Sequence, residues 1–200
     1  MKKWAAGLLL IVFLLSAGGC QSEGFDIEQV RARYAQTVDI DGQADITVNS
    51  GVMVDYTVTY QRRGGVSTVT IISPVSLAGI SATTAQGRAE IVYEDIAVET
   101  LLPAVPGFSP VDALAGVTDD LAGGVPIDSC TEALDGADCV ALTFSSSSGE
   151  YEGEKRVWLD AETLALRRAE FYLDGQMVMA LSMGEMTFSE TQAGADEQDG

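Results

Sequence analysis

The sequence contains no histidine, and this absence removes more chemistry than any other feature of its composition. Without histidine, the chain cannot build a Ser-His-Asp or Cys-His catalytic arrangement, nor a histidine-based zinc or iron site. Lysine is nearly as scarce, because Lys155 is the one lysine beyond the first three residues. We therefore expect no catalytic residues, no metal site and no cofactor.

Positive charge of any kind is rare. The chain has 11 Lys and Arg against 30 Asp and Glu, a formal net charge of -19. Such a field repels phosphate backbones, so a nucleic-acid partner is not expected. Anionic lipid headgroups would not attract the protein either. Attachment to a membrane would therefore have to come from acyl chains.

Long apolar runs are also missing, apart from one short run at the N-terminus. Lys2 and Lys3 precede an apolar stretch over residues 5–15, which is too short for a bilayer span of ~20 residues. Its length suits the apolar region of a secretory signal peptide. Small residues then occupy positions 16–19, directly before Cys20.

The segment LLSAGGCQSE, residues 14–23, resembles the signal of bacterial lipoproteins, which ends in a small residue followed by cysteine. The resemblance implies a signal peptide over residues 1–19, a diacylglycerol group on Cys20 and a short tether over residues 20–24. Acyl chains contribute ~0.8 kcal/mol per buried CH₂, and two chains give stable anchoring. The folded part would then lie outside the cytoplasm on the cell membrane. Two alternatives remain open: ordinary cleavage that leaves a free Cys20 thiol, and an uncleaved anchor.

Cysteine is limited to Cys20, Cys130 and Cys139. Outside the cytoplasm, the last two favour a disulfide. A four-residue loop over 133–136 would place Cys130 opposite Cys139 across a hairpin. The alternative is a pair of buried free thiols.

The body of the chain alternates with a period of two, which is typical of strands. Asp174-Gly175 is a strong hairpin signal, and Gly184 predicts a bulge or bend in the last strand. We expect about nine or ten strands, over residues 43–50, 52–61, 66–73, 80–85, 89–96, 127–133, 138–144, 150–159, 164–173 and 176–188.

Two segments have helical signals instead. Residues 25–38 begin with Asp26 as a candidate N-cap. Residues 109–123 begin with Ser109 as a candidate N-cap and Pro110 at the first helical position. The apolar stripe of this second helix comprises Val111, Leu114, Val117 and Leu121. The lead-in over residues 101–108 is apolar, proline-rich and irregular. We expect one mainly β (α+β) domain over residues 25–188, with a disordered acidic tail over 189–200.

The stretch RVWLDAETLALRRAEFYLDGQMVMALSMGEMTF, residues 156–188, resembles the C-terminal part of LolA-like proteins, the superfamily of outer-membrane lipoprotein-sorting proteins. The order of helix, strands and middle helix is similar over residues 25–188. The resemblance implies a curved antiparallel sheet that forms an incomplete barrel, with both helices on its concave side. Members of the family carry acyl chains or glycolipids, and others bind proteins. The germination lipoproteins of the GerS type, which partner a cell-wall amidase, are the most similar in style.

Methionines on the last predicted strand suggest a ligand site, because methionine adapts to varied apolar partners. Met177, Met179, Leu181 and Met183 share one face. The lead-in would supply a lid, made of Leu101, Leu102, Val105 and Phe108, beside Val111 and Leu114 of the helix. These residues either line a cavity for acyl chains or fill the core under the helix.

We therefore expect a non-enzymatic, lipid-anchored protein of the carrier or chaperone type, with a lipid or acyl chain as its ligand. The alternative is an interaction module that binds or activates an envelope protein such as a cell-wall amidase.

Overall fold

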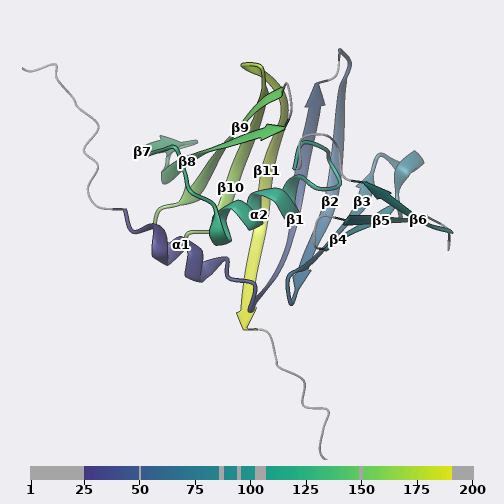
Figure 1. The fold of residues 1–200 in the computed structure, drawn as a ribbon, viewed down its shortest axis with the longest axis horizontal. Coiled ribbons are helices and arrows are strands. Elements are labelled where there is room, and N and C mark those ends of the chain that lie inside the picture. Colours follow the sequence, from purple (N-terminus) through teal and green to yellow (C-terminus); the bar gives the residue numbers. More distant parts are fainter. Residues whose placement is uncertain are drawn as a thin grey trace, which may run out of the picture.

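The computed structural model describes residues 25–49, 51–85, 88–93, 96–101, 107–148 and 151–190. Within them, the strands form one antiparallel sheet of eleven strands in the order β6-β5-β4-β3-β2-β1-β11-β10-β9-β8-β7 (Figure 1). The strands are β1 (Val38–Asn49), β2 (Met53–Arg63), β3 (Val66–Ser73), β4 (Ser81–Ala85), β5 (Arg88–Tyr93), β6 (Ile96–Leu101), β7 (Asp128–Leu134), β8 (Ala137–Ser148), β9 (Tyr151–Asp160), β10 (Leu166–Leu173) and β11 (Gln176–Glu190).

The sheet curves without closing, and the helices α1 (Ile27–Arg33) and α2 (Ala113–Gly123) lie on its concave side (Figure 1). This is the incomplete barrel with helices on the concave face that the sequence resemblance implied, so the predicted fold class is confirmed. A one-turn helix, η2 (Val75–Leu77), joins β3 to β4. No helix within the described residues is both long enough and apolar enough to cross a bilayer.

The strand prediction was one element short. Ten segments were expected, and the structure adds β6 (Ile96–Leu101), which pairs with β5. The prediction ended the preceding strand at residue 96 and treated residues 101–108 as irregular. The alternation continues from Ile96 through Val98 to Thr100, which is the period of a strand.

The hairpin turn at Asp174-Gly175 and the bulge near Gly184 are confirmed. Asp174 and Gly175 have φ values of 49° and 75°, as a two-residue hairpin turn of the primed type requires. The β1–β11 register moves from Gly42↔Met186 to Ala44↔Met183, so β11 holds one extra residue there. That extra residue is the bulge predicted at Gly184.

Helix α1 is shorter than predicted. Asp26 caps it by accepting a hydrogen bond from the Glu28 amide at 3.0 Å. At its C-terminal end, Arg62 of β2 donates to the carbonyls of Tyr34 and Ala35, at 2.6 and 3.1 Å. A basic side chain on the last carbonyls stabilises a helix terminus.

Helix α2 begins later than predicted. Ser109 was expected as its N-cap, but the first helical residue is Ala113. The Asp112 carboxylate accepts hydrogen bonds from the amides of Gly107 and Ser109, at 2.8 and 2.9 Å. It also accepts from the Ser109 hydroxyl at 2.7 Å, so residues 107–112 close into a turn ahead of the helix.

Candidate functional site

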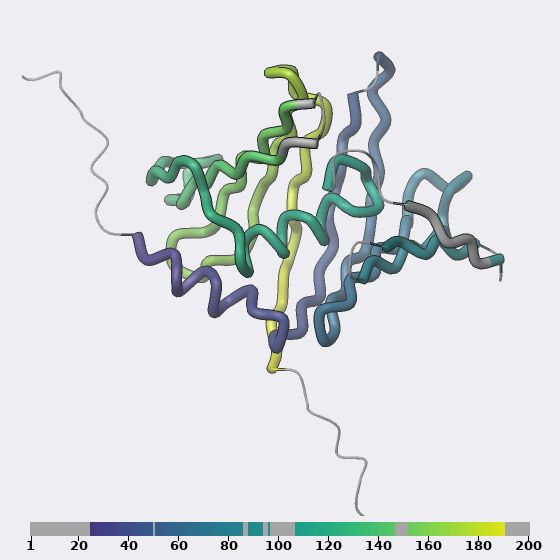
Figure 2. Tube along the Cα trace, viewed as in Figure 1, coloured from purple at the N-terminus to yellow at the C-terminus, as the bar shows by residue number. Residues whose placement is uncertain are grey.

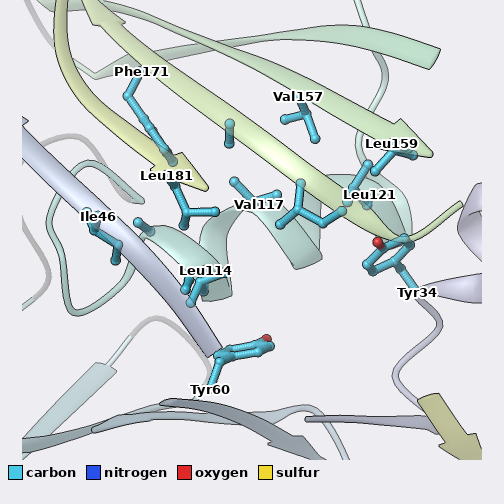
Figure 3. Packing of buried hydrophobic residues seen from close by; sticks show 14 of the residues in the cluster. Tyr34, Ile46, Tyr60, Leu114, Val117, Leu121, Val157, Leu159, Phe171 and Leu181 are labelled. Carbon is cyan, nitrogen blue, oxygen red and sulfur yellow. The ribbon is translucent and has the colours of Figure 1, made fainter. Parts of the chain in front are cut away.

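Helix α2 fills the concave face of the sheet with aliphatic side chains. Leu114, Val117 and Leu121 are each fully buried, one helical turn apart. Figure 3 shows these side chains pointing into the cluster that also holds Phe171 and Leu181 of the sheet. The predicted apolar stripe is therefore confirmed from Leu114 onward. Val111 lies in the turn before the helix and is half-buried.

The methionine stripe is confirmed only in its central part. Met179 is 2% exposed within the main core, and Met183 packs against that core from its edge. Met177 is 44% exposed, so its assignment to the inner surface was wrong. The β10–β11 register shifts between Phe171 and Tyr172, which separates Met177 from the regular alternation next to the hairpin turn.

Part of the predicted lid lies on the concave face as expected. The rings of Phe108 and Phe171 meet edge to face, with centroids 5.6 Å apart and planes at 82°. Gly153 of β9 makes room for Phe108, because a Cβ there would lie 2.9 Å from its ring. Leu101 ends β6, but its side chain, and Leu102 and Val105 as a whole, lie outside the described residues. The lid remains a prediction for these three.

Two glycines allow the end of the lead-in, at Gly107, to pack closely against α2 at Gly116. A Cβ on Gly116 would lie 2.8 Å from the Cα of Gly107, so the helix and the lead-in touch backbone to backbone. Gly107 has a φ of 81°, which favours glycine on conformational grounds as well. Phe108 is thus positioned from both sides, by the glycine contact and by the Asp112 hydrogen bonds.

A few polar groups cross the apolar layer between helix and sheet. The Tyr60 hydroxyl lies 3.0 Å from the Ser67 hydroxyl and 2.8 Å from the Thr118 hydroxyl. Burial raises the pKa of Tyr60 above its ordinary value, since the charged phenolate would be poorly solvated there. Arg62 is also fully buried, and its Nε and Nη1 have no hydrogen-bond partner among the described residues.

Sequence reasoning missed an ion pair in this layer, between Lys155 and Asp120, whose atoms approach closely although Oδ2 of Asp120 accepts no hydrogen bond of good geometry within the described residues. Lys155 of β9 is 4% exposed, and its Nζ lies 2.5 Å from Oδ2 of Asp120 on α2. The sequence held part of the signal. Lys155 alternates with Glu152 and Glu154, which were predicted to face solvent and are exposed. The lysine therefore had to face inward, toward the covered side.

The two body cysteines are free thiols in the structure. The predicted register was wrong, because Asp135-Gly136 forms a two-residue turn in place of the four-residue loop expected. Cys130 is consequently opposite Ala141, and Cys139 is opposite Glu132. Both thiols pack with Trp158 in a small second cluster, and burial raises the pKa of Cys139. They are diagonal neighbours, farther apart than directly opposed residues.

A pocket lies elsewhere on the molecule. A pocket of about 680 Å³ is bordered by Ser145, Glu152, Glu154 and Tyr172, near the β10–β11 turn. Its lining is polar and does not include the predicted ligand-site residues. Within the described residues, no three metal-ligating side chains come together. The apolar layer under α2 brings together Phe108, Leu114, Met179, Leu181 and Met183 of the predicted site.

Comparison with known proteins supports the fold. No protein-family model and no curated protein sequence matches the chain. Three solved structures with similar folds are an uncharacterized conserved protein from Thermus thermophilus, a domain described as an outer membrane lipoprotein-sorting protein from Vibrio parahaemolyticus, and a LolA superfamily protein from Nitrosomonas europaea.

The Thermus protein gives a TM-score of 0.51 at 9% identity, covering 82% of this chain and 86% of its own. The Vibrio domain gives 0.46 at 14%, covering 86% and 93%. The Nitrosomonas protein gives 0.41 at 12%, covering 82% and 93%. At such identities the likeness concerns the fold alone, and of these three the Thermus protein carries it.

Proposed function

We propose that this protein is a non-enzymatic, lipid-anchored protein of the cell envelope that takes up an apolar ligand on the concave face of its sheet. The observation that carries this proposal is the cover itself. Helix α2, of 11 residues, shares the concave face with α1, and Phe108 packs there beside it. We infer that α2 lifts from the sheet and leaves an apolar surface behind.

The ligand must bury the apolar surface that α2 buries in the closed protein. Lifting the helix exposes the side chains that now contact it, among them Phe171, Met179 and Leu181. Exposure of apolar surface costs about 25 cal/mol per Å², and burial of an acyl chain recovers the same amount per area. A long aliphatic chain is therefore the ligand that fits, since a small polar molecule could not offset the loss.

Uptake of ligand can be tested on the purified domain. Native mass spectrometry with added palmitic acid should detect a complex of the folded protein. Met183→Glu places a charge at the half-buried edge of the apolar layer and should abolish that complex. Met177→Glu makes the same change on the same strand at an exposed position and should retain it. Failure of the unmodified protein to bind, or equal loss in both variants, would contradict the proposal.

Anchoring is the second part of the proposal. It rests on the lipoprotein-like signal, with residues 1–19 removed, Cys20 lipidated and residues 20–24 as tether. Cells fed labelled palmitate should incorporate it into the protein, and the Cys20→Ala variant should remain unlabelled and leave the membrane fraction. Labelling that persists in Cys20→Ala would rule out this site.

A second candidate, an interaction module for an envelope protein such as a cell-wall amidase, is favoured by a different observation. Tyr93 and Ile96 are 42% and 66% exposed on β5 and on the edge strand β6. An edge strand can pair with a strand from a partner. Capture of one defined envelope protein by the unmodified domain, lost with Ile96→Asp and retained with Met177→Asp, would favour this candidate over the carrier.

A further inference from the structure

Lys155 is an unusual residue for its position. It is the one lysine of the sequence beyond residue 3, yet its side chain is 5% exposed on the concave face. In the sheet it is opposite Phe144 on one side and Phe171 on the other. Gly107 and Gly116 lie against the ammonium group of Lys155. A Cβ atom on Gly107 would lie 3.2 Å from Nζ, and a Cβ atom on Gly116 would lie 3.6 Å from it. A lysine among aromatic rings is rarely buried unless it has an anionic partner.

The partner of Lys155 is Asp120 of α2, the helix that must move if a ligand is to enter. Asp120 lies on α2, and the 2.5 Å contact with Lys155 joins the helix to the sheet. If α2 lifts to admit a ligand, Asp120 leaves with it and the ammonium group stays on β9. An unpaired charge in an apolar site costs several kcal/mol. A neutral aliphatic ligand would have to bear that cost, whereas an anionic one would remove it.

The buried Arg, Lys and Asp side chains do not share the strong excess of acidic residues in the whole chain. The chain has a formal net charge of -19, yet of the three ionisable Arg, Lys and Asp side chains buried in the described residues two are basic, Lys155 and Arg62, and one is acidic, Asp112. The Asp112 carboxylate already accepts hydrogen bonds from the amides of Gly107 and Ser109. Arg62 donates to main-chain carbonyls through Nη2 alone. Arg62 therefore has free donors for an anion within the described residues, and Lys155 gains the same capacity once Asp120 leaves with α2.

We propose that the ligand is an amphiphile with a single long chain and an anionic head, and that Lys155 binds this head in the place that Asp120 occupies in the closed protein. This inference rests on the proposed carrier function. The head, a carboxylate or a phosphate, lies at Lys155 between β8 and β10. The chain extends over Phe171, Met179 and Leu181 in place of α2.

The experiment measures affinity by displacement of an uncharged fluorescent probe, Nile red, from the full-length protein. Palmitate, monohexadecyl phosphate and 1-hexadecanol share the chain and differ in the head, while acetate and inorganic phosphate supply the anion alone. A charge-assisted contact contributes ~1.5–3 kcal/mol, so both anionic amphiphiles should bind about 10- to 100-fold more tightly than hexadecanol. Acetate and phosphate alone should displace no probe, and displacement by either would overturn the amphiphile assignment.

Variants assign the preference to Lys155. Lys155→Met should bring the palmitate-to-hexadecanol affinity ratio close to one, and Lys155→Arg should keep the preference. Asp120→Asn removes the competing carboxylate and should raise the ratio. Arg168→Met removes a cation that is paired with Glu170 and should leave the ratio unchanged. If Lys155→Met does not fold, as judged by circular dichroism, the Asp120→Asn and Lys155→Arg results decide.

The two proposals fail in different ways. Equal affinity of the unmodified protein for palmitate and hexadecanol overturns the role of Lys155 and leaves the carrier intact. A ratio unchanged by Asp120→Asn, or reduced equally by Arg168→Met, has the same effect. Absence of binding by every amphiphile overturns the carrier, and this inference with it.

Discussion

The sheet has a covered side, the strands that lie near the two helices, and an uncovered side, the strands that extend beyond them. These two groups of strands are built differently. Strands β1, β2 and β9–β11 lie near the two helices, whereas β4 and β5 extend beyond them (Figure 2). Near the helices, the fully buried side chains are large, such as Tyr60, Phe171 and Leu181. On β4 and β5, the buried residues are Ala82 and Ala89. The size of an inward-facing residue therefore follows what covers it, and the alternation of apolar and polar residues alone does not reveal which side has a helix above it.

The largest expected difference between the two sides concerns aromatic residues. Phe171→Ala should lower the free energy of unfolding by ~3–5 kcal/mol, because it leaves a cavity under Phe108 and α2. Tyr93→Ala, on the uncovered side and 42% exposed, should cost ~1 kcal/mol or less. Urea unfolding followed by tryptophan fluorescence measures both. Similar losses would mean that the covered side is no better packed than the other.

A smaller effect is expected where the two sides join. Tyr60→Phe removes the hydroxyl that links Ser67 of β3 to Thr118 of α2. The Thr118 hydroxyl also donates to main-chain carbonyls, so Ser67 loses more. We expect a loss of ~1–2 kcal/mol. Tyr172→Phe removes a hydroxyl that bonds to Glu170 and should cost less than half as much in the same urea titration.

The turn between β9 and β10 gives a pH-dependent test on the covered side. Hydrogen bonds from the amide and hydroxyl of Thr163 and from Arg167 lower the pKa of Asp160 to about 2. Its folded pKa thus lies below the unfolded value of ~3.9. The stabilisation is present above the unfolded pKa and is lost as pH falls toward 2.

Asp160→Asn should therefore destabilise the protein by ~1 kcal/mol at pH 7. The gap to the unmodified protein should narrow steadily between pH 5 and pH 2, in urea titrations at each pH. A gap that stays constant over this range would show that the carboxylate charge does not stabilise the turn.

The smallest effect is expected on the uncovered side. Val75 begins η2 and is 90% exposed. Val75→Ser should change the free energy of unfolding by less than ~0.5 kcal/mol, because an exposed side chain buries almost nothing. Val69→Ser on β3 is the matched control, since Val69 is 2% exposed, and it should lower the free energy of unfolding several-fold more. Thermal melts of both variants measure the difference. A large loss from Val75→Ser would reveal that this turn has a packing partner.

Features that depend on neighbouring residues were predictable from sequence. Alternation gave most strands, and Asp174-Gly175 gave a turn because both positions need positive φ. Features that depend on distant residues were not. The start of α2 depends on the Asp112 carboxylate turning back to Gly107. The β7–β8 register is an exception, because Asp135-Gly136 has the same two-residue turn signal as Asp174-Gly175, and the four-residue loop was expected in spite of it.

The candidate site follows the same division. Leu114 and Met179 were predicted because each belongs to a periodic stripe. The pairing of Lys155 with Asp120 could not be predicted from the sequence, because it joins residues that are far apart in the chain and meet only when the helix packs on the sheet. The pattern shows that a lysine faces inward, but it does not show which of many acidic residues meets it. Met177 was misplaced because a register shift near a turn has no sequence signal of its own.

The central pairing of the sheet joins the first strand of the domain to the last. β1 and β11 are neighbours, although Val38 is paired with Glu190 across almost the whole folded chain. During synthesis, the meander β1–β6 can form early, but one edge of β1 stays open until the final residues of β11 are made. Contacts of such wide sequence separation slow folding and leave strand edges exposed. A nascent chain stalled before residue 176 would therefore present a sticky edge, and we expect such truncated products to need chaperones or to be degraded.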